Sequence, residues 1–578
     1  MGDDLISPSQ AQSADDDLSP LHRREAIQRL EAEHFDVLVI GGGVTGIGCA
    51  LDAASRGLSV AVVEQRDLAS GTSSRSSKLI HGGLRYLQQF KFGLVREALS
   101  ERNLLISKIA PHLVKQVDFL YPLRKPGERF YAGLGIGLYD LMAFSGGNRL
   151  PRHKHLSRRQ VQIKAPSLSP SVNKGAIMFS DASVDDARYV VSVARTAAHL
   201  GALILTSMKV TNLITGNGRV NGAELKCLET GREFDVSCGT VVNATGVWSD
   251  DIEQFAGADR SRVRASKGIH LVIPQDRIDL KTGLILRTAD SVLFVIPSEK
   301  HWIVGTTDSD WQLDRAHPAA TKKDIEYLLT TLNQILKSPV TTDDVVGVYV
   351  GLRPLLKGNE EKTTKLSREH AVTTSTEGLV SISGGKYTTY RVMASDTIDA
   401  VGVDQGRQIP KSPTSEISLI GAQQYKQILG SAEDISETSG VPLVSVNHLI
   451  SRHGDRINEV LDLITADESL KELIDKNLPY LRAEVIHSVR FEAALHLEDV
   501  LTRRTKISIE SWDRGTESAL LVAQLMAGEL GWDQSRIRRE VEHYVKRVES
   551  ERSSNTQPDD KEADASRITA GDIRESFA

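Results

Sequence analysis

The stretch Phe35-Asp-Val-Leu-Val-Ile-Gly-Gly-Gly-Val-Thr-Gly46 joins an apolar run to a glycine-rich loop. The apolar run predicts a strand of a parallel sheet, covered on both faces. Residues 47–56 then have the pattern of a helix closed by Gly57, and residues 59–64 form a second apolar strand ending at Glu64. A glycine pattern of this spacing, between a strand and a helix, predicts a dinucleotide-binding unit.

Each glycine of the pattern Gly41-x-Gly43-x-x-Gly46 has its own physical task. The first permits the tight turn, the second lets backbone N–H groups approach a pyrophosphate, and the third lets helix and strand pack closely. The helix N-terminus favours the negative charge of the pyrophosphate. We expect Glu64 to accept hydrogen bonds from the adenosine ribose hydroxyls, and its charge argues against a 2′-phosphate.

Three later segments favour FAD over NAD as the dinucleotide. The run Ser70-Gly-Thr-Ser-Ser-Arg-Ser-Ser-Lys78 offers hydroxyl and amide donors for a ribitol chain and phosphates. Asn243-Ala-Thr-Gly246 and Gly384-Gly385 provide two further close backbone approaches, although each alone would be an ordinary glycine turn. The residues expected to bind the cofactor are Gly41, Gly42, Gly43, Val44, Thr45, Gly46, Glu64, Gln65, Thr72, Ser73, Lys78, Leu79, Gly82, Gly83, Ala244, Thr245, Gly246, Gly385 and Lys386.

The octapeptide Leu79-Ile-His-Gly-Gly-Leu-Arg-Tyr86 adds chemistry to this binding unit. Its glycine pair, Gly82-Gly83, could admit a flat flavin ring. His81, Arg85 and Tyr86 are side chains suited to a phosphorylated alcohol. The octapeptide therefore indicates an oxidoreductase.

Composition limits the class of protein. The chain has 578 residues, 40% hydrophobic and 25% charged, and its net charge of −6 gives no support to nucleic-acid binding. Its three cysteines have no metal-ligand spacing, so we expect free thiols in a reducing, cytoplasmic compartment and no metal site. No segment is apolar and free of charge over the roughly 18 residues that suggest a spanning helix. The protein is thus expected to be soluble or to lie on a membrane surface; residues 91–111 and 132–144 could face a membrane, but core packing is the favoured interpretation.

The pattern of elements predicts an α/β chain of several parts. The division we expect is a disordered tail and leading helix over 1–34; an FAD-binding Rossmann-like domain from 35–90, 171–264 and 345–405; an antiparallel-sheet substrate (cap) domain from 91–170 and 265–344; an all-α domain over 415–550; and a mobile tail over 551–578.

Several motifs together resemble the FAD-dependent glycerol-3-phosphate dehydrogenases. They are Gly41–Gly46, Ser73–Tyr86, Asn243-Ala-Thr-Gly-Val-Trp248, Gly351-Leu-Arg-Pro354, Leu366-Ser-Arg-Glu-His370, Gly384-Gly-Lys-Tyr-Thr-Thr-Tyr-Arg391 and Leu497-Glu-Asp-Val-Leu-Thr-Arg-Arg504. The resemblance covers roughly residues 35–550 and implies the amino-acid-oxidase-like flavoprotein fold. It also implies oxidation of sn-glycerol 3-phosphate to dihydroxyacetone phosphate, with electrons passed through FAD to a quinone at the inner face of the cell membrane. Membrane-surface association and a homodimer are compatible with it.

Candidate roles follow from the chemistry of these side chains. Arg85, Tyr86, Arg353 and Arg368 are candidates for the substrate phosphate, with Arg353 and Lys386 also placed near the reaction centre. Histidine can accept a proton at neutral pH at little cost, so His270 and His81 are the candidate bases, His270 being favoured. The rivals are a glycerol-3-phosphate oxidase that uses oxygen, a flavin amino-acid oxidase and, least favoured, a flavoprotein scaffold without activity.

Overall fold

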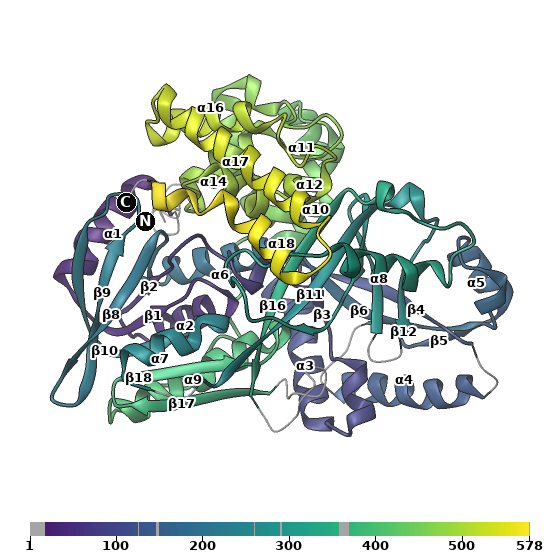
Figure 1. Cartoon of the computed structure of the whole chain (residues 1–578), viewed down its shortest axis with the longest axis horizontal. Helices are drawn as coiled ribbons and strands as arrows, with labels where there is room; N and C mark the ends of the chain where they lie inside the picture. Colours follow the sequence, from purple (N-terminus) through teal and green to yellow (C-terminus); the bar gives the residue numbers. More distant parts are fainter. Residues whose placement is uncertain are drawn as a thin grey trace, which may run out of the picture.

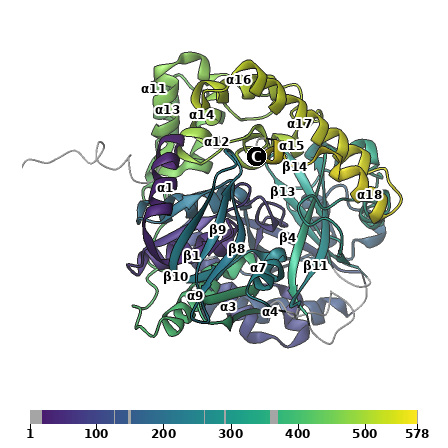
Figure 2. The same cartoon turned by 60° about the vertical axis from the view of Figure 1, so that its left-hand side comes forward.

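The computed structural model describes residues 18–124, 127–145, 150–258, 261–288, 292–357 and 369–576. Two large sheets lie side by side, and a helical domain covers one end of both (Figures 1 and 2). The expected arrangement of a nucleotide-binding sheet, a second sheet and a helical domain is therefore observed.

The first sheet is built on the strand that opens the glycine loop. Its central strands are parallel in the order β18-β10-β1-β2-β7, while β17 pairs antiparallel with β18, and β9 with β10 and β8. The strands are β1 His34–Ile40, β2 Val60–Val63, β7 Leu203–Leu205, β8 Met208–Gly216, β9 Arg219–Cys227, β10 Glu233–Asn243, β17 His370–Thr376 and β18 Leu379–Gly384.

Alternate side chains of β1 enter two different cores, which explains why the strand is apolar throughout. Val37 and Val39 pack with the helices α2 Val44–Ser55, α6 Asp186–His199 and α9 Tyr390–Asp404. Leu38 and Ile40 pack on the opposite face with α1 Pro20–Ala32, α7 Ser249–Phe255 and the β8–β10 layer.

The second sheet has ten strands in the order β15-β11-β14-β13-β12-β4-β6-β3, with β16 beside β11 and β5 beside β6. Its strands are β3 Leu79–Ile80, β4 Val114–Pro122, β5 Lys154–Leu156, β6 Ala176–Val184, β11 Val263–Pro274, β12 Gly283–Arg287, β13 Val292–Ser298, β14 His301–Gly305, β15 Ser309–Asp310 and β16 Gly347–Leu356. The associated helices are α3 Phe92–Leu104, α4 Glu128–Ser145, α5 Arg158–Lys164 and α8 Lys322–Asn333. All its pairings are antiparallel except that of β12 with β4.

The C-terminal part is helical, as predicted. Its elements are α10 Tyr425–Gly430, α11 Ala432–Ser439, α12 Leu443–His453, α13 Ile457–Ala466, α14 Arg482–Phe491, the π-helix η12 Asp499–Arg504, α15 Ile507–Glu510, α16 Ala519–Leu530, α17 Gln534–Ser554 and α18 Asp560–Arg567. Among the described residues, no helix has the length and apolar content needed to cross a bilayer.

Three expected boundaries are wrong. Residues 171–184 and 347–356 were placed with the nucleotide-binding domain, but β6 pairs with β4 over nine residues and β16 pairs with β11 over ten. Both strands therefore belong to the second sheet. The tail over 551–578 was expected to be mobile. Instead α17 continues to Ser554, α18 follows, and Arg574 is buried.

Candidate active site

The glycine loop turns where β1 meets β10. Gly41 has a φ of +116°, and a Cβ there would lie 2.7 Å from the carbonyl oxygen of Ala244. A Cβ at Gly46 would lie 2.0 Å from the carbonyl oxygen of Gly41. Both positions therefore require glycine, and the roles predicted for a tight turn and for close helix packing agree with this geometry.

The ends of β2 and α2 present polar groups beside this loop. The two carboxylate oxygens of Glu64 accept hydrogen bonds from the N–H groups of Gly42 (2.7 Å) and Arg66 (2.8 Å). The N–H group of Val44, in the first turn of α2, donates to Ser73 Oγ (2.9 Å). A glycine turn, a helix N-terminus and an oriented carboxylate together match the groups that a dinucleotide requires, so the residues present fit FAD.

A cavity of about 490 Å³ extends from this loop into the space between the two sheets. It is lined by residues of both sheets, so the chain brings segments distant in sequence to one site. The predicted residues that line it are Gly41, Gly43, Val44, Thr45, Glu64, Gln65, Thr72, Ser73, Leu79, His81, Tyr86, Ala244, Thr245, Gly246, His270, Arg353, Gly385 and Lys386.

Strand alternation puts His270 on the cavity face of β11. Its neighbours Ile269 and Leu271 point into the core under α8, whereas His270 stacks on Tyr349 of β16 with ring centroids 4.7 Å apart. His270 Nε2 lies 2.8 Å from the cavity-lining Ser77 Oγ. Burial, together with the charges of Arg353 and Lys78, holds the pKa of His270 well below its usual value, so the ring is neutral near pH 7.

Arg353 lies on the face of β16 that also carries Tyr349, and hydrogen bonds hold it in a fixed position. Its guanidinium donates to the carbonyl oxygen of Thr307 (3.2 Å) and to Thr306 Oγ1 (3.0 Å). A Cβ at Gly268 would come within 2.5 Å of this guanidinium. Gly268, the cross-strand neighbour of Gly351, therefore leaves the space that Arg353 occupies.

Lys386 and Tyr86 also line the cavity and contact each other. Lys386 Nζ lies 4.1 Å from the centroid of the Tyr86 ring, a cation–π contact. Gly83, with a φ of +78°, makes room for that ring, because a Cβ there would lie 2.4 Å from it. His81 lines the cavity too and packs edge-on against Phe294. Cationic and histidine side chains from four segments thus converge on one space.

Several predicted residues lie elsewhere. Gly82 was expected beneath a flavin, but its N–H group donates to Tyr139 Oη (2.8 Å) and it does not line the cavity, and neither does Gly83. Lys78 forms a buried ion pair with Asp186 instead of facing the cavity. Gly42 and Gly46 act within the loop and do not line the cavity. Arg368 lies outside the described residues. Arg85 falls in the short helix Leu84–Gln89, and its side chain is outside what the structure describes.

Sequence reasoning missed further lining residues. They are Arg66, Arg75, Ser77, Met208, Lys209, Val210, Trp248 and Gly268, among others. Arg75 and Ser77 belong to the serine-rich run already singled out, and Gly268 precedes His270 by two positions, so strand alternation was a usable signal. Burial, with nearby arginines, lowers the pKa of Arg75 to about 9. Met208–Val210 had no local signal.

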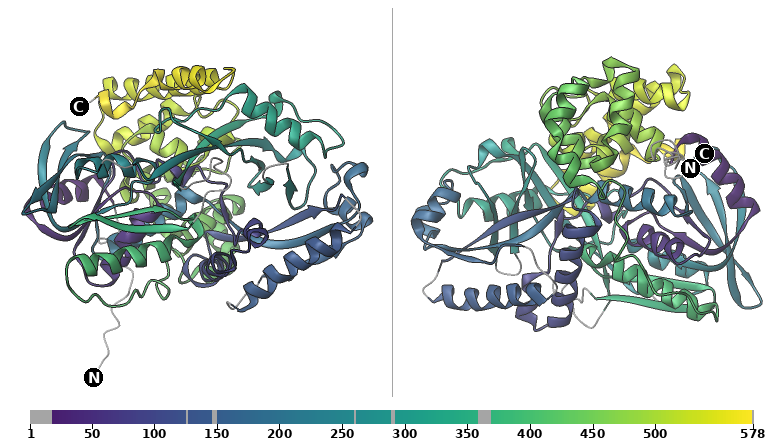
Figure 3. Two further views of the ribbon diagram at one scale, coloured as in Figure 1. Left: turned by 60° about the horizontal axis from the view of Figure 1, so that its bottom comes forward. Right: turned by 180° about the vertical axis from the view of Figure 1, so that it is seen from behind.

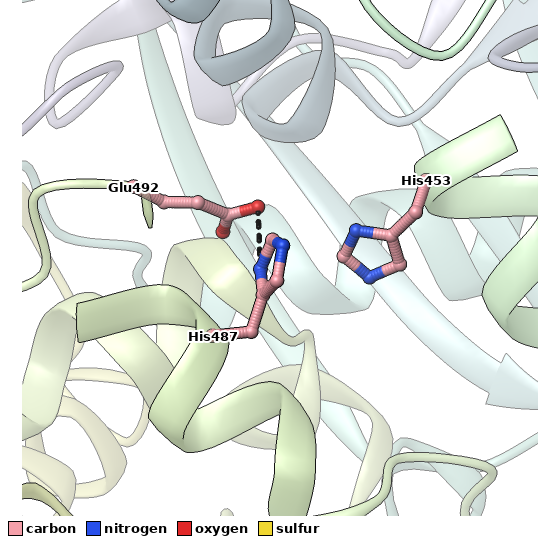
Figure 4. Close-up of side chains that lie close together, drawn as sticks. All are labelled: His453, His487 and Glu492. Atoms are coloured by element: carbon pink, nitrogen blue, oxygen red, sulfur yellow. Dashed lines mark ion pairs between the residues drawn. The ribbon is translucent and has the colours of Figure 1, made fainter. Parts of the chain in front are cut away.

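A buried histidine group lies away from this cavity, in the helical domain. The ligand-type atoms of His453, His487 and Glu492 all lie within 4.8 Å of one another (Figure 4). Glu492, however, is bound through both oxygens by Arg188 of α6, and His487 Nε2 lies 2.9 Å from Glu459. Burial opposes charging of His487, but the two carboxylates outweigh it and raise its pKa. We interpret the group as an ion-pair network that joins the helical domain to α6.

Comparison with protein families agrees with the fold and the cavity. The family described as FAD dependent oxidoreductase matches residues 36–391, and the one described as the C-terminal domain of alpha-glycerophosphate oxidase matches residues 412–537. The fold and the site thus define an FAD-dependent oxidoreductase with an additional helical domain.

Individual relatives narrow this class. Glycerol-3-phosphate dehydrogenase 2 of Mycobacterium tuberculosis is 50% identical over 96% of this chain and 95% of its own. The mitochondrial glycerol-3-phosphate dehydrogenase of Homo sapiens is 35% identical over 90% of this chain and 74% of its own. A structure of the glycerol-3-phosphate dehydrogenase from Bacillus halodurans complexed with FAD superposes with a TM-score of 0.76 at 28% identity, covering 92% of this chain and 98% of that one. The chain belongs to the family of FAD-dependent glycerol-3-phosphate dehydrogenases.

Proposed function

We propose that the protein oxidises sn-glycerol 3-phosphate to dihydroxyacetone phosphate and passes the electrons to a quinone. The observation that carries the proposal is the convergence of Arg353, Lys386, Tyr86 and His270 on one cavity beside the dinucleotide loop. Two cations and a phenol suit a phosphate, and a neutral histidine suits a proton acceptor. The names of the relatives support the same substrate.

In this proposal some residues bind the substrate phosphate and others take up the hydroxyl proton. Bound FAD supplies the acceptor for the hydride that leaves the substrate carbon. Arg353 binds the phosphate as a planar donor held by Thr306 and Thr307, and Lys386 adds a point charge. Arg85 and Arg368 stay candidates for further phosphate contacts. His270 Nε2 takes the hydroxyl proton, with Ser77 as its neighbour, and His81 positions the substrate.

We propose a peripheral position on the inner, cytoplasmic face of the cell membrane, because one side of α4 is apolar and exposed. Phe130, Leu134, Leu138 and Leu141 follow one stripe of the helix, and the first is 75% exposed. The opposite stripe, Ile136, Tyr139 and Ala143, is buried. In Figure 3 the helix runs along the outer edge of the molecule. A helix of this kind can rest its apolar side in the headgroup region.

The test is to mix purified, FAD-loaded protein with glycerol 3-phosphate under nitrogen and to follow the flavin absorbance. We expect rapid bleaching with glycerol 3-phosphate and none with glycerol, because glycerol lacks the group that the cations bind. Absence of bleaching by glycerol 3-phosphate would overturn the proposed substrate. A second measurement in air separates the acceptors: fast reoxidation by a soluble quinone with little peroxide supports the dehydrogenase, whereas stoichiometric peroxide indicates the oxidase.

A further inference from the structure

The loop that follows β2 is held from outside its own domain. Glu64, Gln65 and Arg66 of this loop line the cavity, and the next residue, Asp67, is fully buried. The carboxylate of Asp67 accepts hydrogen bonds from Arg504 Nη1 (2.8 Å) and Nη2 (2.7 Å), and from Arg503. Both arginines belong to η12 in the helical domain. The motif Leu497–Arg504 therefore contacts the loop that carries the proposed ribose-binding carboxylate.

The C-terminal segment contacts the same end of the cavity at two more points. Asp572 accepts a hydrogen bond from Arg66 Nε (2.7 Å). Arg574, which is buried, donates to Ser207 Oγ (3.0 Å), next to the cavity-lining Met208. Arg574 also pairs with Asp499 of η12 (3.0 Å). One short segment thus joins the loop after β2, the start of β8 and the helical domain.

The segment reaches this position after crossing the second sheet. Gln557 accepts a hydrogen bond from the N–H group of Lys322 (2.9 Å), and Asp560 pairs with the buried Lys267 of β11 (2.5 Å). In Figure 1, α18 lies against β11 and β16, while the chain ends on the side of the first sheet. The segment therefore spans both sheets across the region where the cavity lies between them.

We propose that residues 559–576 form a strap that retains the adenosine half of FAD by positioning the loop Glu64–Asp67. The inference rests on the proposed contact between Glu64 and the adenosine ribose. Asp572 and Arg574 act through Arg66 and Ser207, and they are positioning residues. Arg66 also lies 5.7 Å from the centroid of the Trp248 ring, which lines the cavity. By holding Arg66, the strap therefore also positions Trp248.

The decisive variant is Asp572→Asn, which removes the charge that Arg66 faces and keeps the shape of the side chain. We expect the FAD-loaded variant to release FAD about tenfold faster, the effect of losing one charge-assisted hydrogen bond. Release is followed by the rise of free-flavin fluorescence on dilution. The matched control is Glu562→Gln, the same loss of charge on α18, and it should release FAD like the unchanged protein. A chain ending at Gln557 should release FAD faster than Asp572→Asn does.

Separate binding of the two halves of the cofactor distinguishes a local effect on the adenosine site from general damage to the fold. For the apoprotein of Asp572→Asn, we expect weaker binding of ADP and unchanged binding of riboflavin. Equal losses for both probes, or no change in ADP affinity and FAD release, would overturn the strap. These readouts do not involve glycerol 3-phosphate, so a protein that fails to oxidise this substrate but shows the ADP effect would refute only the proposed reaction.

Discussion

At the scale of single residues, the environment of His270 decides its protonation. The ring is buried between Tyr349 and Ser77, and the charges of Arg353 and Lys78 oppose protonation. A residue placed so that it stays neutral beside two cations is ready to accept a proton, although its low pKa makes it a weak base. The cation proposed to hold the phosphate therefore also keeps the proposed base unprotonated.

This environment gives a test by substitution and pH. We expect His270→Asn to slow anaerobic bleaching of the flavin about 10²–10⁴-fold while FAD stays bound, the usual contribution of a general base. In the unchanged protein, the bleaching rate should be level through pH 6.5 and fall only at lower pH, where His270 becomes protonated. Stopped-flow absorbance measures both. The control is His301→Asn on β14, a buried histidine outside the cavity. A normal rate in His270→Asn would remove it as the base.

Residues inside contiguous motifs could be predicted, and residues that act through space could not. Glu64 and Gly41 follow from the spacing of one short unit, whose geometry is local. The hydrogen bond from the Gly82 N–H group to Tyr139 could not be predicted, because Tyr139 is far away in sequence. The ion pair of Lys78 could not be predicted for the same reason, since its partner Asp186 comes from α6. Met208 reaches the cavity because β7 pairs with β2 and β8 begins shortly after β7, so that the Met208 N–H group donates to the carbonyl oxygen of Glu64 (2.8 Å).

At the scale of elements, the turn between β1 and α2 leaves no room for a side chain at Gly46. In Gly46→Ala the new Cβ would meet the Gly41 carbonyl at 2.0 Å, so the helix must move away from the strand. We expect loss of bound FAD and a lower Tm, since overpacking of this kind costs about 1–3 kcal/mol or more. The ratio of flavin to protein absorbance and a thermal melt measure this. Gly528→Ala in α16, where a Cβ meets nothing within 4 Å, is the matched control. A yellow Gly46→Ala protein of unchanged Tm would contradict the close packing.

Many of the strands could be predicted, among them β1, β2 and β11, but β4 and β6 were not recognised, and the assignment of strands to sheets could not be predicted. β6 and β16 are apolar in a way that suits either sheet, and their partners β4 and β11 are separated from them by tens of residues. Alternation of apolar residues identifies a strand but does not indicate which other strand it pairs with. The expected boundaries at 171 and 345 were wrong for this reason.

At the scale of the whole molecule, buried ion pairs join the parts. Arg188 pairs with Glu492, Arg503 and Arg504 with Asp67, and Arg574 with Asp499. The segment 551–578 was predicted to be mobile because it is charged and low in apolar residues. The prediction was wrong because charged residues such as Asp572 and Arg574 are paired inside the molecule. Removing one partner of a buried pair leaves an uncompensated charge, so the helical domain is expected to depend on the nucleotide-binding domain for its stability.

The exposed stripe of α4 gives the last prediction, on how the molecule meets a membrane. The double variant Phe130→Gln/Leu134→Gln removes apolar surface that is 75% and 61% exposed. Burial of such a side chain contributes about 1.5–3 kcal/mol, so we expect binding to phosphatidylglycerol–phosphatidylethanolamine vesicles to weaken at least tenfold. Co-sedimentation measures binding. The control, Leu429→Gln/Leu520→Gln, changes exposed leucines of α10 and α16 and should bind normally. Quinone reduction in vesicles should fall with binding, while bleaching by glycerol 3-phosphate in solution stays unchanged. Equal vesicle binding by both double variants would exclude α4 as the docking surface.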